Sequence, residues 1–303
     1  MKYRGNMTKP VQRMKGALEA EGLRVYAPRA GRFLDVDEVY DVFGLLVQIF
    51  GRPPRGDYPG QDYANYHEWL TQIEQTGATL MRDDSLLQQY VRDRRLELVR
   101  VAHDYQALVQ VAERQRWDLA APYRPDVMKR ALHNAPSLSN EGKRLLASTY
   151  LERLATERAA QGQPFSLKYI LKRVTSLDWN LLDVFYRLCG FEHFKRMFDL
   201  AEQGRDEGPV SNLGLITQYL ARFNDEYNVS LITADLLIDG LFRRLFFGSY
   251  LFALYRRGET EFEDVDDPFP KGRIPFLTIH QAKGLEFPVV VMGNLRKDDR
   301  GPN

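Results

Sequence analysis

A helical spacing of apolar residues fills the middle of this chain and constrains its fold more than any other feature. From residue 66 to residue 258, large apolar residues recur every three or four positions, and breaks rich in glycine and proline separate the runs. One run, Leu86–Trp117, is long, and another, Ala234–Arg257, follows Thr233 as a capping residue. Apolar residues at this spacing form one face of an amphipathic helix. The sequence therefore predicts a large block of packed helices.

Both ends of the chain depart from this long helical pattern and contain short apolar runs instead. Near the N-terminus, a predicted helix over residues 8–22 leads into a predicted strand, Leu23–Ala27. Near the C-terminus, the runs Phe276–Ile279 and Val289–Met292 flank a compact polar turn. Short apolar runs bounded by polar turns are typical of buried strands. An acidic, proline-terminated connector over residues 259–272 lies between the helical block and these two C-terminal runs. We therefore expect a domain boundary at this connector.

The length and composition of the chain limit its domain number, its mode of nucleic-acid binding and its cellular compartment. A chain of 303 residues can bury a sizeable core and hold two domains, or one domain and part of another. The formal net charge is +1, so affinity for nucleic acid has to come from local patches. The single cysteine, Cys189, excludes an internal disulfide and fits a reducing compartment. No apolar run approaches the roughly 20 residues that span a bilayer, and no signal peptide precedes the helices. These features predict a cytoplasmic protein with no membrane partner.

The polar turn near the C-terminus carries the most specific local pattern. It reads Thr278-x-His280-x-Ala282-Lys283-Gly284-Leu285-Glu286-Phe287. Its glycine lets the backbone approach a ligand closely, and successive N–H groups in such a turn can form a concave site for an anion. The spacing resembles helicase motif V of the superfamily-1 DNA helicases related to UvrD, Rep and PcrA.

A second stretch, near the N-terminus, resembles the same helicases. In that family a glycine, two large apolar residues and a Glu-Ile/Val-x-Asp pattern follow a strand. Here these places are taken by Gly31, Phe33, Leu34, Glu38, Val39 and Asp41, and the upstream Tyr3-Arg4-x-Asn6 resembles the end of motif IVa. Considered as a helix start, Asp35 with Glu38 three positions later also predicts a capping box.

The resemblance implies a mainly α fold with a small α/β part. In UvrD-like helicases a helical domain, 2B, is inserted into the RecA-like motor domain 2A. For this chain it implies a partial 2A segment over residues 1–35, a helical 2B domain over 36–270 and a second partial 2A segment with motif V over 271–303. The two chain ends would then form one incomplete RecA-like layer. The specific motifs cover only about residues 3–41 and 273–293.

The resemblance also implies roles for the motif residues. Gly284 and Glu286 are expected to bind the nucleotide, with the Glu286 carboxylate accepting a hydrogen bond from a ribose hydroxyl. The residues expected to contact the DNA backbone are Arg4, Asn6, Thr278 and His280. Such donors hold phosphates without reading the bases. For Lys283 two roles stay open, a phosphate contact or an ion pair with a carboxylate.

The sequence lacks the parts that phosphoryl transfer requires. No Gly-x-x-x-x-Gly-Lys-Ser/Thr occurs, so no P-loop cradles phosphates, and no strand is followed by paired acidic residues that would hold magnesium. We therefore expect a fragment, itself inactive, of an ATP-dependent 3′-to-5′ DNA helicase of repair or replication. ATP and Mg²⁺ are the cofactors expected for the intact parent protein, and no cofactor or metal is expected in the fragment.

The partners implied are single-stranded DNA, duplex DNA as a second partner, and the remaining 1A, 1B and 2A domains of the same chain. The family's duplex-binding Gly-Ile-Gly triplet is absent here. Basic clusters occur instead at Arg92, Arg94, Arg95 and Arg100, at Lys168, Lys172 and Arg173, and at Lys195 and Arg196. They are interpreted either as DNA contacts or as a solvated face, and the sequence favours the second.

A function from a different class stays open. The chain is alternatively a non-catalytic helical module with a helicase-like framework, which binds protein partners or regulates a motor.

Overall fold

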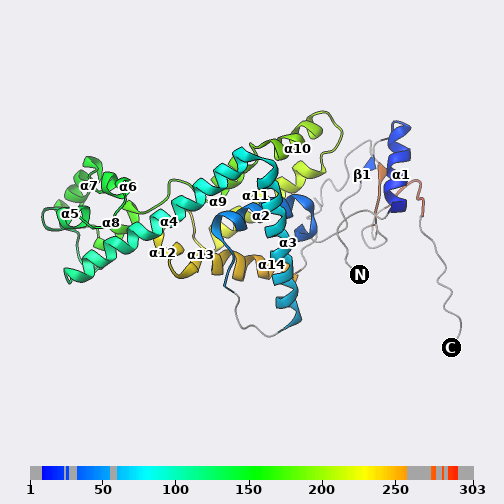
Figure 1. The fold of residues 1–303 in the computed structure, drawn as a ribbon. Helices are drawn as coiled ribbons and strands as arrows, with labels where there is room; N and C mark the ends of the chain where they lie inside the picture. The colour runs from blue at the N-terminus through cyan, green and yellow to red at the C-terminus, as the bar shows by residue number, and fades with distance from the viewer. Residues whose placement is uncertain are drawn as a thin grey trace. The chain divides into compact units, whose positions relative to one another are not determined.

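The computed structural model describes residues 9–23, 25–26, 33–54, 60–257, 274–277, 282 and 286–292. Contacts divide the chain into two units, one over Phe33–Glu259 and one that combines residues 1–32 with residues 260–303. The described residues are mainly helical, as predicted (Figure 1). The predicted domain limits after residues 35 and 270 stay a prediction. None of the described helices combines the length and the hydropathy that a membrane crossing requires.

In the unit formed by the two chain ends, the described residues form one helix and two very short strands. Helix α1 (Lys9–Ala20) ends before Gly22, whose φ of 77° suits the predicted glycine stop. Strand β1 (Val25–Tyr26) pairs in parallel with β2 (Ile274–Pro275), so segments from opposite ends of the sequence lie side by side. Strand β1 lies within the predicted run Leu23–Ala27 but is shorter. Strand β2 lies before the predicted run Phe276–Ile279, and the two described residues of that run, Phe276 and Leu277, belong to no strand.

The predicted strand Val289–Met292 is wrong. These four residues belong to no strand, and between 67% and 80% of each is exposed. A strand requires a neighbour for its backbone N–H and C=O groups, and none of the described residues supplies one to this run.

The helical unit begins with four elements that build its centre. They are η1 (Phe33–Asp35), α2 (Asp37–Phe50), α3 (Gln61–Asp83) and α4 (Ser85–Arg114). Helix α2 is apolar on nearly all sides, and its Val39, Phe43 and Leu46 are fully buried. A helix that is hydrophobic all round belongs in a core. Helix α4 agrees with the predicted run Leu86–Trp117, and its N-cap is Asp84, whose side chain accepts a hydrogen bond from the Leu87 N–H.

Helices α2 and α3 cross at two glycines, where their backbones touch. A Cβ atom on Gly44 would collide with the Ile73 carbonyl oxygen and lie 2.9 Å from the Gly77 nitrogen. A Cβ atom on Gly77 would lie 2.5 Å from the Gly44 carbonyl carbon. The contact is therefore possible only because neither residue has a side chain.

The other helices of this unit follow in two groups. Figure 1 shows four of them at one end of α4: α5 (Pro125–His133), α6 (Asn140–Leu146), α7 (Thr149–Ala160) and α8 (Leu167–Val174). The remaining elements are α9 (Leu181–Leu188), α10 (Glu192–Glu202), α11 (Gly208–Glu226), α12 (Ala234–Leu237), η2 (Ile238–Gly240), α13 (Leu241–Arg243), η3 (Arg244–Tyr250) and α14 (Leu251–Arg257).

The single helix predicted over Ala234–Arg257 is replaced by the consecutive elements α12, η2, α13, η3 and α14. Asp239 and Gly240 both take positive φ, 54° and 67°, and this breaks the helix. After the break, η3 is a π-helical turn that carries Phe246 and Tyr250 against Phe223 of α11. The apolar spacing predicted Leu237, Leu241, Leu245, Tyr250 and Leu254 as the buried stripe. Only Tyr250 and Leu254 are buried, and Phe242, Phe246 and Phe247 are buried in place of the other three, because the break shifts the face that the later residues turn to the core.

Two acidic residues of α2 are buried and link this helix to its neighbours. Glu38 is 3% exposed and accepts a hydrogen bond of 2.8 Å from the Asn212 side chain on α11. Asp41 is 7% exposed and lies 2.7 Å from Nε2 of His193 on α10. The predicted capping box is wrong, because Val36 is the N-cap of α2 and no side chain caps it.

The link between Asp41 and His193 predicts a pH-dependent stability. The hydrogen bond to Asp41 raises the pKa of His193, and the Asp41 charge adds to this effect, while burial and Arg196 oppose it. Because the pKa of His193 is higher in the folded protein than in the unfolded chain, its protonation stabilises the fold. This contribution is fully present below the unfolded-state pKa of about 6.5 and is lost as the pH rises through the folded-state pKa. Melting temperatures of the wild type and His193→Gln should therefore differ more at about pH 6 than at about pH 8.

A second variant checks the cause. Asp41→Asn should remove the same pH dependence, since the imidazolium then has no anion beside it. If the wild type and His193→Gln differ equally at both pH values, the Asp41 link does not act through charge.

Candidate nucleic-acid interface

The residues predicted to bind nucleotide and DNA fall largely outside the described part of the chain. Glu286 is described: it is exposed and belongs to no helix or strand. The others that lie outside the described residues are Arg4, Asn6, Thr278, His280, Lys283 and Gly284. Their roles therefore stay predictions, and the geometry that the structure gives is that of the helical unit.

Helix α8 contains one of the predicted basic clusters. Its buried side consists of Leu167, Ile170, Leu171 and Val174, and its remaining positions are Lys168, Tyr169, Lys172 and Arg173. The helix contains no acidic residue. Ser166 fixes its start, because its hydroxyl accepts a hydrogen bond from the Tyr169 N–H at 3.2 Å. The amphipathic pattern thus places a tyrosine and three cations on one side.

Some cations of the predicted clusters are held by carboxylates. The ion pairs are Arg94 with Glu97 at 2.9 Å, Arg100 with Asp104 at 3.6 Å, Lys172 with Asp235 at 2.5 Å and Arg196 with Glu192 at 3.1 Å. Others are exposed and form no ion pair with any described residue, namely Arg92, Arg95, Lys168, Arg173 and Lys195. The solvated-face interpretation fits the cations that are paired with carboxylates. The exposed cations without such a pair are available to bind an anionic ligand.

A charged cleft of about 430 Å³ lies between α4, α6 and the end of α8. Its lining residues are Glu97, Arg100, Glu141, Arg144, Leu145, Arg173, Ser176, Leu177 and Asp178. Three arginines face three carboxylates there, so the cleft as a whole carries little net charge. Arg173 reaches only the Ser176 hydroxyl, at 3.5 Å. Arg100 and Arg144 are paired with carboxylates, so a phosphate could bind Arg173 without displacing a carboxylate from it.

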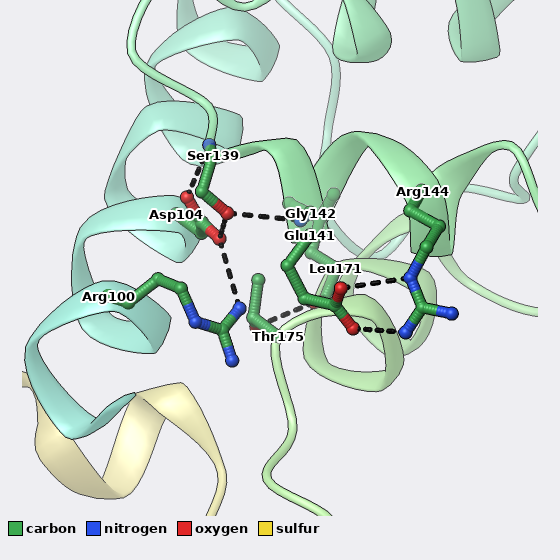
Figure 2. A network of polar contacts seen from close by, with 8 residues as sticks. All are labelled: Arg100, Asp104, Ser139, Glu141, Gly142, Arg144, Leu171 and Thr175. Atoms are coloured by element: carbon green, nitrogen blue, oxygen red, sulfur yellow. Dashed lines mark hydrogen bonds and ion pairs between the residues drawn. The ribbon is translucent and has the colours of Figure 1, made fainter. Parts of the chain in front are cut away.

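Asp104 fixes one wall of this cleft (Figure 2). Its carboxylate is 1% exposed and accepts hydrogen bonds from the backbone N–H and the hydroxyl of Ser139, at 2.8 Å and 2.5 Å. The same hydroxyl accepts a bond from the Gly142 N–H and so caps α6. Arg100 completes the network from the α4 side. A buried carboxylate with this many partners orients α6 on α4.

Arg144 and Glu141 form a second pair at the cleft, at the right of Figure 2. The guanidinium donates from Nε and Nη2 to the two oxygens of Glu141, at 2.9 Å and 2.5 Å. The hydrogen bond from Arg144 lowers the pKa of Glu141. Both side chains are exposed, so the pair holds Arg144 in place but adds little to stability.

Within the described ranges, no group of three His, Cys, Asp or Glu side chains lies together in a way that would hold a metal ion.

Comparison with protein families gives one match, at the end of the chain. Residues 256–302 match the family model of the UvrD-like helicase C-terminal domain. This C-terminal stretch is similar to the UvrD-like helicases. The predicted resemblance is thereby confirmed, and the matched stretch contains every residue of the predicted motif V. Neither the curated proteins nor the solved structures gave a match.

The match covers only the C-terminal end of the chain. Almost all of the helical unit precedes residue 256, so its basic face and charged cleft lie outside the matched stretch. Sequence reasoning predicted the cations of α8 but missed Tyr169 beside them and the pair formed by Glu141 and Arg144. For Tyr169 a signal was present, since the spacing Lys-Tyr-x-x-Lys-Arg places all four residues opposite the apolar side of an amphipathic helix.

Proposed function

We propose that this chain is a fragment of an ATP-dependent DNA helicase that moves 3′ to 5′ on single-stranded DNA. In this proposal the helical unit is the 2B domain and the two chain ends belong to the 2A motor domain. The observation that carries it is the match of residues 256–302 to the UvrD-like helicase C-terminal domain. The parent protein would act in repair or replication, in the cytoplasm, with ATP and Mg²⁺ as its cofactors.

The strands at the chain ends support a larger α/β layer. Parallel strands normally lie in sheets that are covered on both faces, and β1 and β2 pair over only two residues each. The run Val289–Met292 exposes four consecutive apolar side chains. A contiguous exposed apolar run of this kind is typical of a surface that another segment covers. The remaining 1A, 1B and 2A segments of a longer protein would supply that cover.

The proposed roles follow the motif positions. Gly284 and Glu286 bind the nucleotide, and Thr278 and His280, with Arg4 and Asn6, contact the DNA backbone. The exposed Glu286 carboxylate is available to a ribose hydroxyl. Lys283 contacts a phosphate or pairs with a carboxylate.

Two substitutions in the longer protein test these roles. Glu286→Gln keeps an acceptor oxygen but removes the charge, so a charge-assisted hydrogen bond becomes a neutral one. The Michaelis constant for ATP should rise about five- to tenfold while affinity for DNA stays nearly unchanged. His280→Ala removes a DNA contact, so affinity for single strands and the stimulation by DNA should fall while basal hydrolysis remains. The measurements are steady-state ATP hydrolysis and oligonucleotide binding, with a thermal melt of each variant. The same defect in both variants would contradict the division of roles.

A second candidate is a non-catalytic module that binds a protein. It is favoured by three exposed apolar residues of α4, Leu86, Leu96 and Val99, which are 59% to 69% exposed. A longer protein that lacks DNA-stimulated ATP hydrolysis would support this candidate over the helicase.

A further inference from the structure

An aromatic stack lies at the start of α8, next to its basic face. The rings of Phe165 and Tyr169 have centroids 4.3 Å apart and an angle of 15° between their planes. The Arg158 guanidinium, from α7, lies 5.3 Å from the centre of the Phe165 ring. Three flat groups from α7, the connecting segment and α8 are thus assembled, and Tyr169 is the member on the helix that carries the cations.

Tyr169 is built to receive a further flat group. One face of its ring is covered by Phe165, yet 43% of the residue is exposed. Its backbone is fixed by the Ser166 cap. A ring that is already stacked and exposed can accept another ring without reorganisation, and pre-organised groups lose little entropy on binding.

The charges around Tyr169 indicate an anionic ligand. Lys168 precedes it and Arg173 follows one helical turn later, on the same side as the ring. Both are exposed, and neither forms an ion pair with a described residue. Arg173 also lines the charged cleft, where Arg144 lies. Because Arg144 is paired with Glu141 there, the cations available beside the ring are Lys168 and Arg173.

We propose that Tyr169 stacks a base of single-stranded nucleic acid, while Lys168 and Arg173 contact the adjoining phosphates. An aromatic face flanked by unpaired cations suits a strand that presents both bases and phosphates. Recognition would tolerate any sequence, because every base has a π-face. That the strand is DNA rather than RNA rests on the proposed function, whereas the stacking site itself rests on this geometry.

The experiment measures binding of labelled oligo-dT to the 303-residue chain by fluorescence anisotropy, beside an oligonucleotide of equal length that lacks bases. The wild type should bind oligo-dT more tightly than the abasic strand. Tyr169→Ala should weaken binding of oligo-dT about 5- to 150-fold and remove the preference over the abasic strand. Tyr169→Phe should keep the preference, because the ring remains.

Matched controls separate stacking from a general surface effect. Tyr150 on α7 is 60% exposed, and its ring contact is with Arg153 rather than with another ring. Tyr150→Ala should leave binding unchanged. Lys168→Ala and Arg173→Ala should each reduce the salt dependence by about 0.7 in the slope of log affinity against log salt. Arg153→Ala, at an exposed arginine that pairs with Glu157 at 3.7 Å, should not change that slope.

Three outcomes would overturn the proposal. Equal binding of oligo-dT and the abasic strand by the wild type would exclude base stacking. If Tyr169→Ala binds oligo-dT as tightly as the wild type and melts at the same temperature, Tyr169 does not stack a base. Binding of a labelled acidic peptide, with no binding of labelled oligo-dT, would identify a protein partner instead. Tighter binding of oligo-U than of oligo-dT would keep the stacking site and contradict its assignment to DNA.

Discussion

Alanine in place of Gly44 or Gly77 should destabilise the helical unit by about 3 kcal/mol, the upper end of the range for an overpacked core. The added methyl group meets backbone atoms rather than the end of a side chain, and a backbone cannot rotate away. Relief requires α2 and α3 to separate along their whole crossing. That movement would loosen buried contacts such as those of Leu45 and Ile73.

A third glycine supplies the matched control. Gly214 lies within α11, is exposed, and has no heavy atom within 4 Å of where its Cβ would stand. Gly214→Ala should therefore stabilise the protein by about 0.5–1 kcal/mol through helix propensity alone. Urea or thermal unfolding of the three variants measures the difference. A Gly44→Ala protein as stable as the wild type would show that α2 and α3 do not meet through backbone contact.

The helical part of the fold could be predicted because its signal is local. Apolar residues at helical spacing are contained within a few turns of sequence, and the structure keeps the long run predicted over Leu86–Trp117 as helix α4. The crossing at Gly44 and Gly77 could not be predicted in this way. Glycine within a helix only lowers helix propensity, and nothing local says that two glycines 33 positions apart will meet.

Long-range partners explain the remaining differences. Glu38 fits a capping box by spacing, but in the structure it is buried because Asn212, far away in the sequence, supplies its hydrogen bond. Val289–Met292 has a strand-like composition, yet a strand is defined by its neighbours and none is described beside this run. Propensity alone does not create a β-sheet.

The two candidate sites also differ in how local their sequence signals are. Motif V is a compact pattern, so it could be recognised in the sequence, and the family match contains it. The roles of its residues stay predictions, and most of them lie outside the described residues. The stack of Phe165 and Tyr169 has a weaker sequence signal. Its members come from a helix and the segment before it, and their near-parallel geometry depends on how α7 and α8 pack.

We propose that this chain belongs to a DNA-dependent motor without containing the phosphate-binding parts of that motor. The 303 residues include no P-loop, and phosphoryl transfer without a phosphate cradle and a magnesium site has nothing to stabilise the charge that develops. The most direct test measures ATP hydrolysis, with and without single-stranded DNA, by the purified chain and by the longer protein that contains it.

We expect no hydrolysis above background from the chain alone and hydrolysis stimulated by DNA from the longer protein. DNA-stimulated hydrolysis by the chain alone, abolished by a substitution within residues 1–303, would contradict the account, as would a longer protein that hydrolyses no ATP.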